Sequence, residues 1–80
     1  MTDRSNPALP RSLTELMGQA LTMEREAVAR YSELADMMET HNNPEVAVLF
    51  RKMAGYEQLH VNQILADRGW ADDVVLPRQR

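Results

Sequence analysis

Two long stretches of helical apolar periodicity, separated by a short polar turn, most limit what this chain can fold into. Residues spaced alternately by three and four form one stripe in each stretch, as in helices that bury one side. The first stripe comprises Leu13, Met17, Ala20, Glu24, Ala27, Tyr31, Leu34 and Met38. The second comprises Val46, Phe50, Met53, Glu57, His60 and Ile64. We call these stripes the seam. They predict an all-α protein built on an antiparallel two-helix hairpin.

Capping signals set the limits of the first helix. Ser12-x-x-Glu15 is a capping-box pattern directly before the periodic run, and it predicts a helix start at Ser12. The periodicity continues to about Thr40. Residues 1–11 contain two prolines and no apolar period, so we expect a flexible N-terminal arm there.

The turn and the second helix follow from His41-Asn42-Asn43-Pro44. Asn43 suits the N-cap of the second helix, and Pro44 suits its first position, where the missing N–H costs nothing. The second helix should run to about Arg68, with Gly69 as a left-handed C-cap. The hairpin thus covers residues 12–69. Residues 70–80 should form a C-terminal tail with at most one extra helical turn, in which Trp70 could fold back.

Three ionisable residues occupy seam positions where apolar residues are expected: Glu24, Glu57 and His60. Burying unpaired charges is costly, so inward carboxylates indicate a cation, a proton or a paired base. Glu57 and His60 are three residues apart and share one helix face. Glu24 and His60 lie at about 24 Å of helix rise from the turn, and Glu57 at about 20 Å, so all three should be level. This placement predicts a metal site.

One hairpin supplies two carboxylates and one imidazole, too few for two metal ions, and it cannot shield its own seam from water. Two hairpins would form a four-helix bundle containing a Glu from each of two helices and a Glu-x-x-His from each of the other two. That set of ligands is the pattern of ferritin-like di-iron bundles. We therefore expect a homodimer.

The motifs resemble a known family over about residues 13–66. The run Glu24-Arg-Glu-Ala-Val-Ala-Arg-Tyr31 is similar to the Glu-x-x-Ala-x-x-x-Tyr run of rubrerythrins, and Asn43-Pro44-Glu45 is followed by Glu57-x-x-His60. The chain looks like one hairpin repeat of the rubrerythrin and bacterioferritin group, and is most similar to encapsulated ferritins. The resemblance implies that Glu24, Glu57 and His60 bind iron and that Tyr31 lies beside the metals.

The resemblance further implies a ferroxidase that oxidises Fe(II) with dioxygen at a di-iron site between subunits, for iron storage or detoxification. Mn or Zn could replace iron, because carboxylate and imidazole ligands do not select among these metals by affinity alone. One alternative is a rubrerythrin-like peroxide reductase, which would need a separate electron donor because the chain has no cysteine. Another is a dimerising hairpin without metal.

Composition limits the partners. The net charge of -3 argues against binding to nucleic acid or to an anionic membrane, and no apolar run approaches the length of a membrane span. We expect a cytoplasmic protein that assembles with itself into a dimer or a higher oligomer. The resemblance adds an encapsulin shell as a partner, with this chain as cargo inside the nanocompartment.

Overall fold

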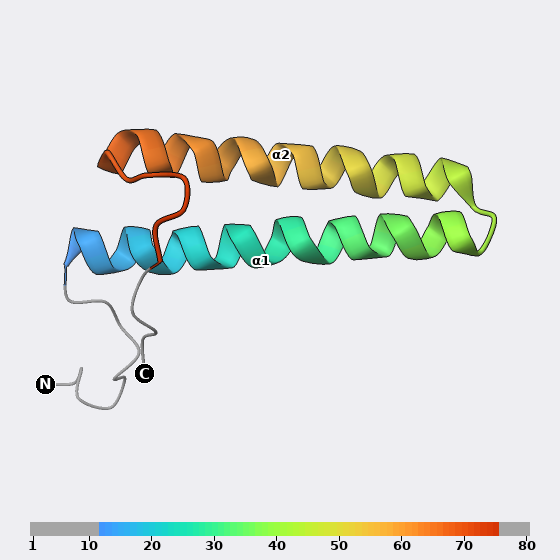
Figure 1. Cartoon of the computed structure of the whole chain (residues 1–80), viewed down its shortest axis with the longest axis horizontal. Coiled ribbons are helices and arrows are strands. Elements are labelled where there is room, and N and C mark those ends of the chain that lie inside the picture. Colours follow the sequence, from blue (N-terminus) through green and yellow to red (C-terminus); the bar gives the residue numbers. More distant parts are fainter. Residues whose placement is uncertain (1–11, 76–80) are drawn as a thin grey trace, which may run out of the picture.

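The computed structural model describes residues 12–75, which form two antiparallel helices lying side by side (Figure 1). Helix α1 spans Leu13–Thr40 and helix α2 spans Pro44–Arg68. Both ranges agree with the sequence prediction, and residues 12–75 contain no strand, so the all-α hairpin is confirmed. The arm expected over residues 1–11 and the last five residues of the expected tail lie outside the described residues.

The predicted cap opens α1, and a left-handed residue closes it. The Ser12 side chain accepts a hydrogen bond from the Glu15 backbone N–H at 3.1 Å. At the other end Asn42 adopts φ 60°, and the Asn43 N–H donates to the Met38 carbonyl at 2.7 Å. This arrangement is a Schellman motif, with Asn in the place that Gly usually takes. The sequence prediction did not identify this role of Asn42.

Asn43 stands at the N-cap of α2, but its side chain makes no capping hydrogen bond, so that part of the prediction is wrong. Its backbone already serves both helices, because its N–H closes α1 and its carbonyl accepts from the Ala47 N–H at 3.1 Å. The resulting ψ of 69° departs from the extended conformation in which a capping side chain reaches the first turn. Pro44 occupies the first helical position, as predicted.

The C-terminal cap of α2 agrees with the prediction. Gly69 has φ 69°, in the left-handed region, and its N–H donates to the Ala66 carbonyl. The Trp70 N–H donates to the Leu65 carbonyl at 2.9 Å, so Trp70 does fold back. Together these two bonds satisfy carbonyls that the helix end would otherwise leave without partners.

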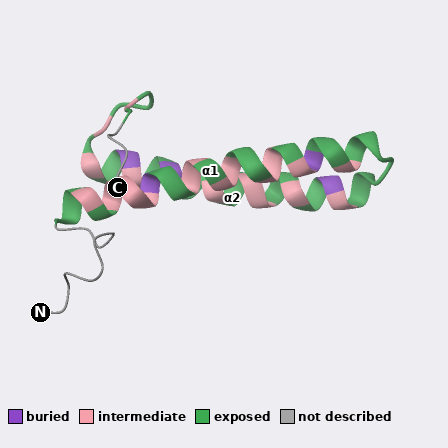
Figure 2. Cartoon of the chain, turned by 90° about the horizontal axis from the view of Figure 1, so that it is seen from below, coloured by how far each residue is buried: buried purple, intermediate pink, exposed green. Residues whose placement is uncertain are grey.

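The contact line between the helices differs from the seam. The buried apolar residues of the described chain are Leu21, Ala35, Ala47, Val61 and Leu65, and none of them belongs to the seam. The buried side chains of α1 and the partly buried Val28 are spaced by seven residues, as in a pair of supercoiled helices. In Figure 2 the buried segments are few and lie along the hairpin between half-buried and exposed ones.

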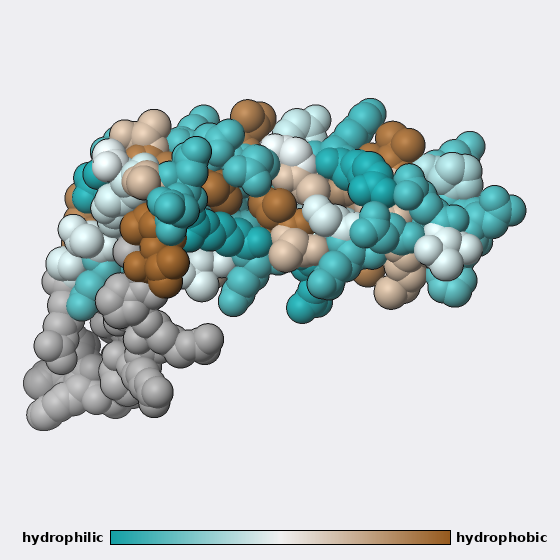
Figure 3. Space-filling model, viewed as in Figure 1, coloured by the Kyte–Doolittle hydropathy of each residue, from teal (hydrophilic) through white to brown (hydrophobic). Residues whose placement is uncertain are grey.

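The seam lies beside this contact line and remains half-buried, apart from the exposed Leu13 and His60. The expectation that one hairpin cannot shield its own seam agrees with this burial. We call the side formed by the seam the open face. It continues into exposed apolar residues at helical spacing from seam positions: Leu16 and Met23 on α1, and Leu49 and Tyr56 on α2. Figure 3 shows apolar side chains left at the surface among polar ones.

The opposite side of the contact line is closed by the segment after α2. Residues 70–75, which we call the strap, turn back and reach α1 (Figure 1). Trp70 and Val74 pack against the buried cluster of Leu21, Val61 and Leu65. Within the described part of the expected tail, Trp70 and Val74 are thus packed on the hairpin, and the other residues of the strap are exposed. We call this side the covered face.

Near the turn, the helices are joined by charged side chains. Arg51 of α2 contacts Asp36 Oδ1 at 3.0 Å and Glu39 Oε1 at 2.8 Å, both on α1. These carboxylates raise the pKa of Arg51. Neither described helix is long and apolar enough to cross a membrane.

Candidate metal centre

The three ionisable seam residues meet on the open face. Glu24 comes from α1, and Glu57 and His60 come from successive turns of α2. One ligand atom from each lies within 4.8 Å of the others. His60 Nδ1 is 3.2 Å from Glu57 Oε1 and 3.6 Å from Glu24 Oε2. The expectation that these residues lie level in the hairpin is therefore confirmed.

The cluster is only partly shielded from solvent. The side chains of Glu24 and Glu57 are 29% and 26% exposed, and that of His60 is 53% exposed. This follows from the position of the seam beside the contact line, where a single neighbouring helix covers each side chain from one direction. The three donor atoms are thus accessible to an ion from solvent.

A hydrogen bond between the carboxyl groups of Glu24 and Glu57 shifts their pKa values in opposite directions. The bond with Glu57 raises the pKa of Glu24 above its ordinary value of 4.5, and partial burial and the negative charge of Glu57 add to the rise. The same bond lowers the pKa of Glu57. As the pH falls, Glu24 thus takes up a proton before Glu57 does, a pattern typical of acids brought together without a cation. A divalent cation bound there would replace that proton.

The donor set fits a transition-metal ion. Two carboxylates and an imidazole are the ligands found in iron, manganese and zinc sites, and these metals tolerate the same oxygen and nitrogen donors. Donor atoms within 4.8 Å of one another can converge on one ion after small side-chain rotations. The group holds three ligands, which leaves coordination positions for further ligands.

Tyr31 lies farther along the open face. It is seven residues from Glu24, about 10 Å of helix rise toward the turn. Its ring stacks on Phe50 of α2, with ring centroids 6.1 Å apart and planes inclined by 21°. The role of Tyr31 beside a metal stays a prediction.

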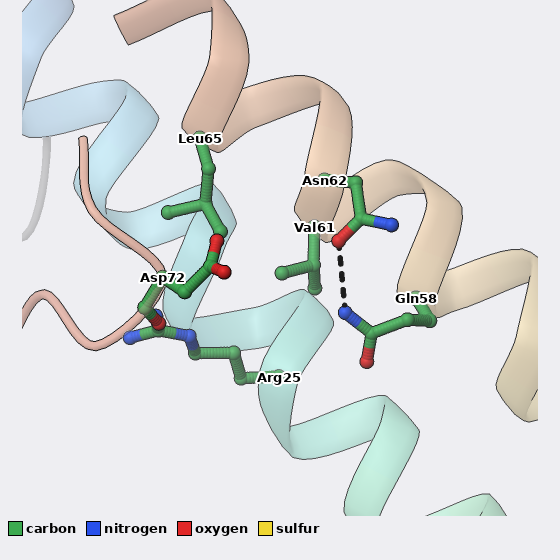
Figure 4. A pocket seen from close by; sticks show the side chains of 6 residues that line it. All are labelled: Arg25, Gln58, Val61, Asn62, Leu65 and Asp72. Carbon is green, nitrogen blue, oxygen red and sulfur yellow. Dashed lines mark hydrogen bonds between the residues drawn. The ribbon is translucent and has the colours of Figure 1, made fainter. Parts of the chain in front are cut away.

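The covered face carries residues that no sequence pattern had indicated. Arg25 Nη1 donates to the Val74 carbonyl at 2.7 Å, and Nη2 donates to the Asp72 carbonyl at 2.9 Å. Next to these bonds is an open pocket, shown in Figure 4, lined by Arg25, Gln58, Val61, Asn62, Leu65 and Asp72. Arg25 and Gln58 each directly follow a carboxylate of the cluster, so they point about 100° away from it around their helices. Contacts across almost 50 residues have no local sequence signal.

Comparison with known proteins places the chain in a family. Searches of curated proteins and of solved structures gave no significant match. A family model described as Rubrerythrin matches residues 15–78. The matched range includes Glu24, Glu57 and His60, and membership implies an iron-binding protein of the ferritin-like class. Because the match covers most of the sequence, the chain belongs to the rubrerythrin family.

Proposed function

We propose that this chain is a ferroxidase whose di-iron site forms between two copies of the hairpin. The observation that carries the proposal is the convergence of Glu24, Glu57 and His60 within 4.8 Å on a half-buried face. These three residues are the proposed metal ligands. Membership of the rubrerythrin family supports iron as the metal.

The second copy is proposed because one hairpin is insufficient in two respects. It offers three ligands, whereas two hairpins offer four carboxylates and two imidazoles, the set found in ferritin-like di-iron bundles. It also leaves apolar side chains of the open face in water, among them Met23 at 68% and Tyr56 at 63% exposure. A second hairpin packed on the open face would cover that surface and bring the two clusters together.

In the proposed reaction Fe(II) is the substrate. Two Fe(II) ions each lose one electron, and one O2 molecule takes up both electrons and two protons to become hydrogen peroxide. The carboxylates Glu24 and Glu57 balance the added positive charge of the ferric products, and His60 binds through a neutral ring nitrogen. A dimer of this size encloses no cavity for mineral, so storage would require a larger assembly or a shell protein.

Peroxide reduction is a second candidate, favoured by the family match itself. There, hydrogen peroxide takes two electrons and two protons to give two water molecules. The chain contains no cysteine for a thiolate-bound iron donor, so the electrons would come from a separate protein. Fe(II)-loaded protein mixed with either oxidant separates the candidates, because a peroxide reductase reacts much faster with peroxide than with O2.

The test is the substitution Glu57→Ala, with Glu26→Ala as control. Glu57→Ala removes two proposed ligands from each dimer, so the rate of ferric absorbance after O2 is admitted to anaerobic Fe(II) protein should fall at least about 100-fold. Glu26 is exposed, lies two residues from Glu24 and is outside the seam, so Glu26→Ala should retain much of the rate. Circular dichroism should show that both apo proteins remain folded. A wild-type rate in Glu57→Ala contradicts the ligand assignment.

A further inference from the structure

We propose that the strap, acting through Arg25, positions Glu24 for metal binding. The inference rests on the proposed metal site and concerns a part of the molecule outside it. Arg25 is not one of the proposed metal ligands. It is a positioning residue on the covered face.

Two hydrogen bonds hold the Arg25 side chain on the strap. A single guanidinium donates to the carbonyls of Asp72 and Val74 at 2.9 and 2.7 Å. Two bonds from one planar group fix both the direction and the plane of the side chain, which a single bond would not do. Figure 4 shows the Arg25 side chain extending from α1 to the strap residue Asp72.

The strap is itself attached to α2 and to the buried cluster. The Trp70 N–H is bonded to the last turn of α2, and Trp70 and Val74 pack on the cluster that joins both helices. The Val74 N–H also donates to the Ala71 carbonyl at 3.1 Å, which closes a turn within the strap. The carbonyls that hold Arg25 are therefore fixed relative to α2.

The residues that the strap holds are sequence neighbours of the proposed metal ligands. Arg25 directly follows Glu24, and Val61 in the cluster beneath the strap directly follows His60. Holding Arg25 restricts the rotation of α1 about its own axis at the level of Glu24. A rotation of about 10° would move a carboxylate about 5 to 6 Å from the axis by about 1 Å. Displacements of that size are large for a metal ligand.

The structure contains a matched control. Arg51 also joins distant parts of the chain through two contacts of its guanidinium, but near the turn. Its partners Asp36 and Glu39 lie 12 and 15 residues from Glu24, which is roughly 18 and 22 Å of helix rise. Both arginines tie segments together, so loss of either should lower stability. Only Arg25 is placed to orient Glu24.

The experiment is a titration with Mn(II), followed by the loss of the free-ion electron paramagnetic resonance signal. It needs no turnover and no oxygen. The titration uses a protein concentration at which native mass spectrometry shows the same oligomeric state for all variants. Arg25→Gln should raise the Kd for Mn(II) about tenfold, in the range known for residues that orient metal ligands. Arg51→Gln should leave the Kd unchanged, and Arg25→Lys should lie between wild type and Arg25→Gln.

A second variant covers the case in which Arg25→Gln does not fold. Val74→Ala weakens the strap without changing either helix, and should raise the Kd in the same direction. The strap proposal is overturned if Arg25→Gln or Val74→Ala binds Mn(II) like wild type, or if Arg51→Gln weakens binding as much as Arg25→Gln. Absence of Mn(II) binding in wild type overturns the metal site itself, and this proposal with it.

Discussion

The two faces of the hairpin differ in how they are covered. On the covered face the chain returns over its own helices, and Trp70 and Val74 complete an apolar cluster with Leu21, Val61 and Leu65. On the open face no described segment covers the seam, and the side chains of Glu24 and Glu57 remain more than a quarter exposed. The strap therefore stabilises the single hairpin, whereas the open face leaves room for the proposed ion and the proposed second hairpin. The predictions below act on the open face or on the covered face, except the last, which acts on the ion pairs near the turn.

The largest effect is expected from Met53→Lys on the open face. Met53 is half-buried and lies one turn from Glu57 on the seam. In a single hairpin the lysine ammonium can reach solvent, so the monomer should stay folded. In the proposed dimer two added ammonium groups would lie in the buried interface, at a desolvation cost of several kcal/mol each, so the dimer Kd should rise by at least about 100-fold.

Analytical ultracentrifugation measures this change, and circular dichroism checks the fold. A Met53→Lys dimer as tight as wild type would show that the open face is not the interface.

The second-largest effect is expected from Trp70→Ala on the covered face. Trp70→Ala removes the largest side chain of the strap from the apolar cluster, and should lower the free energy of unfolding by about 2 to 3 kcal/mol, less than for a fully buried tryptophan. Chemical denaturation of the apo protein at low concentration measures it. If Trp70→Ala is neutral there while the dimer is lost, the roles of the two faces are reversed.

Acidification should act on the open face through the carboxyl pair. Because its pKa is raised, Glu24 retains a proton at higher pH than an ordinary glutamate, and this proton competes with the metal. Metal affinity should therefore fall as the pH is lowered toward and through that raised pKa. Titrations with Mn(II) at a series of pH values measure it.

Without metal, the two shifts act in opposite directions on stability. The raised pKa of Glu24 adds stability at low pH that is lost as the pH rises through it. The lowered pKa of Glu57 adds stability that is present above its ordinary value and lost as the pH falls through the lowered one. The pair should thus give the apo protein only a weak pH dependence of unfolding.

In the Mn(II) titrations, a metal affinity independent of pH would show that the carboxylates are not ligands.

The smallest effect is expected from Arg51→Gln, which belongs to neither the strap nor the metal cluster. The Arg51 side chain is 45% exposed, and ion pairs in solvent contribute little because water and salt screen them. The loss of stability should be well below that of Trp70→Ala and should shrink further at high salt. Thermal unfolding at low and high salt measures both. A loss as large as that of Trp70→Ala would mean that the turn end, rather than the strap, stabilises the hairpin.

Local signals predicted much of this structure. Ser12, Pro44 and Gly69 fixed the helix limits, because capping depends on a few neighbouring residues. The level of Glu24, Glu57 and His60 followed from helix rise alone. The contact line was missed because the seam criterion selected the stripe with polar members, while the buried alanines Ala35 and Ala47 resemble ordinary helix residues in sequence.

The strap could not be predicted for a different reason. Its contacts join Arg25 to residues almost 50 positions later, and backbone carbonyls, which every residue has, are the acceptors. Asn42 was missed because asparagine suits several turn positions equally. The contacts of the strap depend on the return of the chain over its own helices, which local residue patterns do not reveal.

Native mass spectrometry with anaerobic Fe(II) counts chains and metal ions in one species, so it can show whether two hairpins share one di-iron site. We expect wild type to take up iron as two chains with two ions, and Glu57→Ala to lose the ions. A single chain that binds one ion and stays monomeric, or a dimer that takes up no iron at any Fe(II) concentration, would contradict a di-iron site shared between two hairpins.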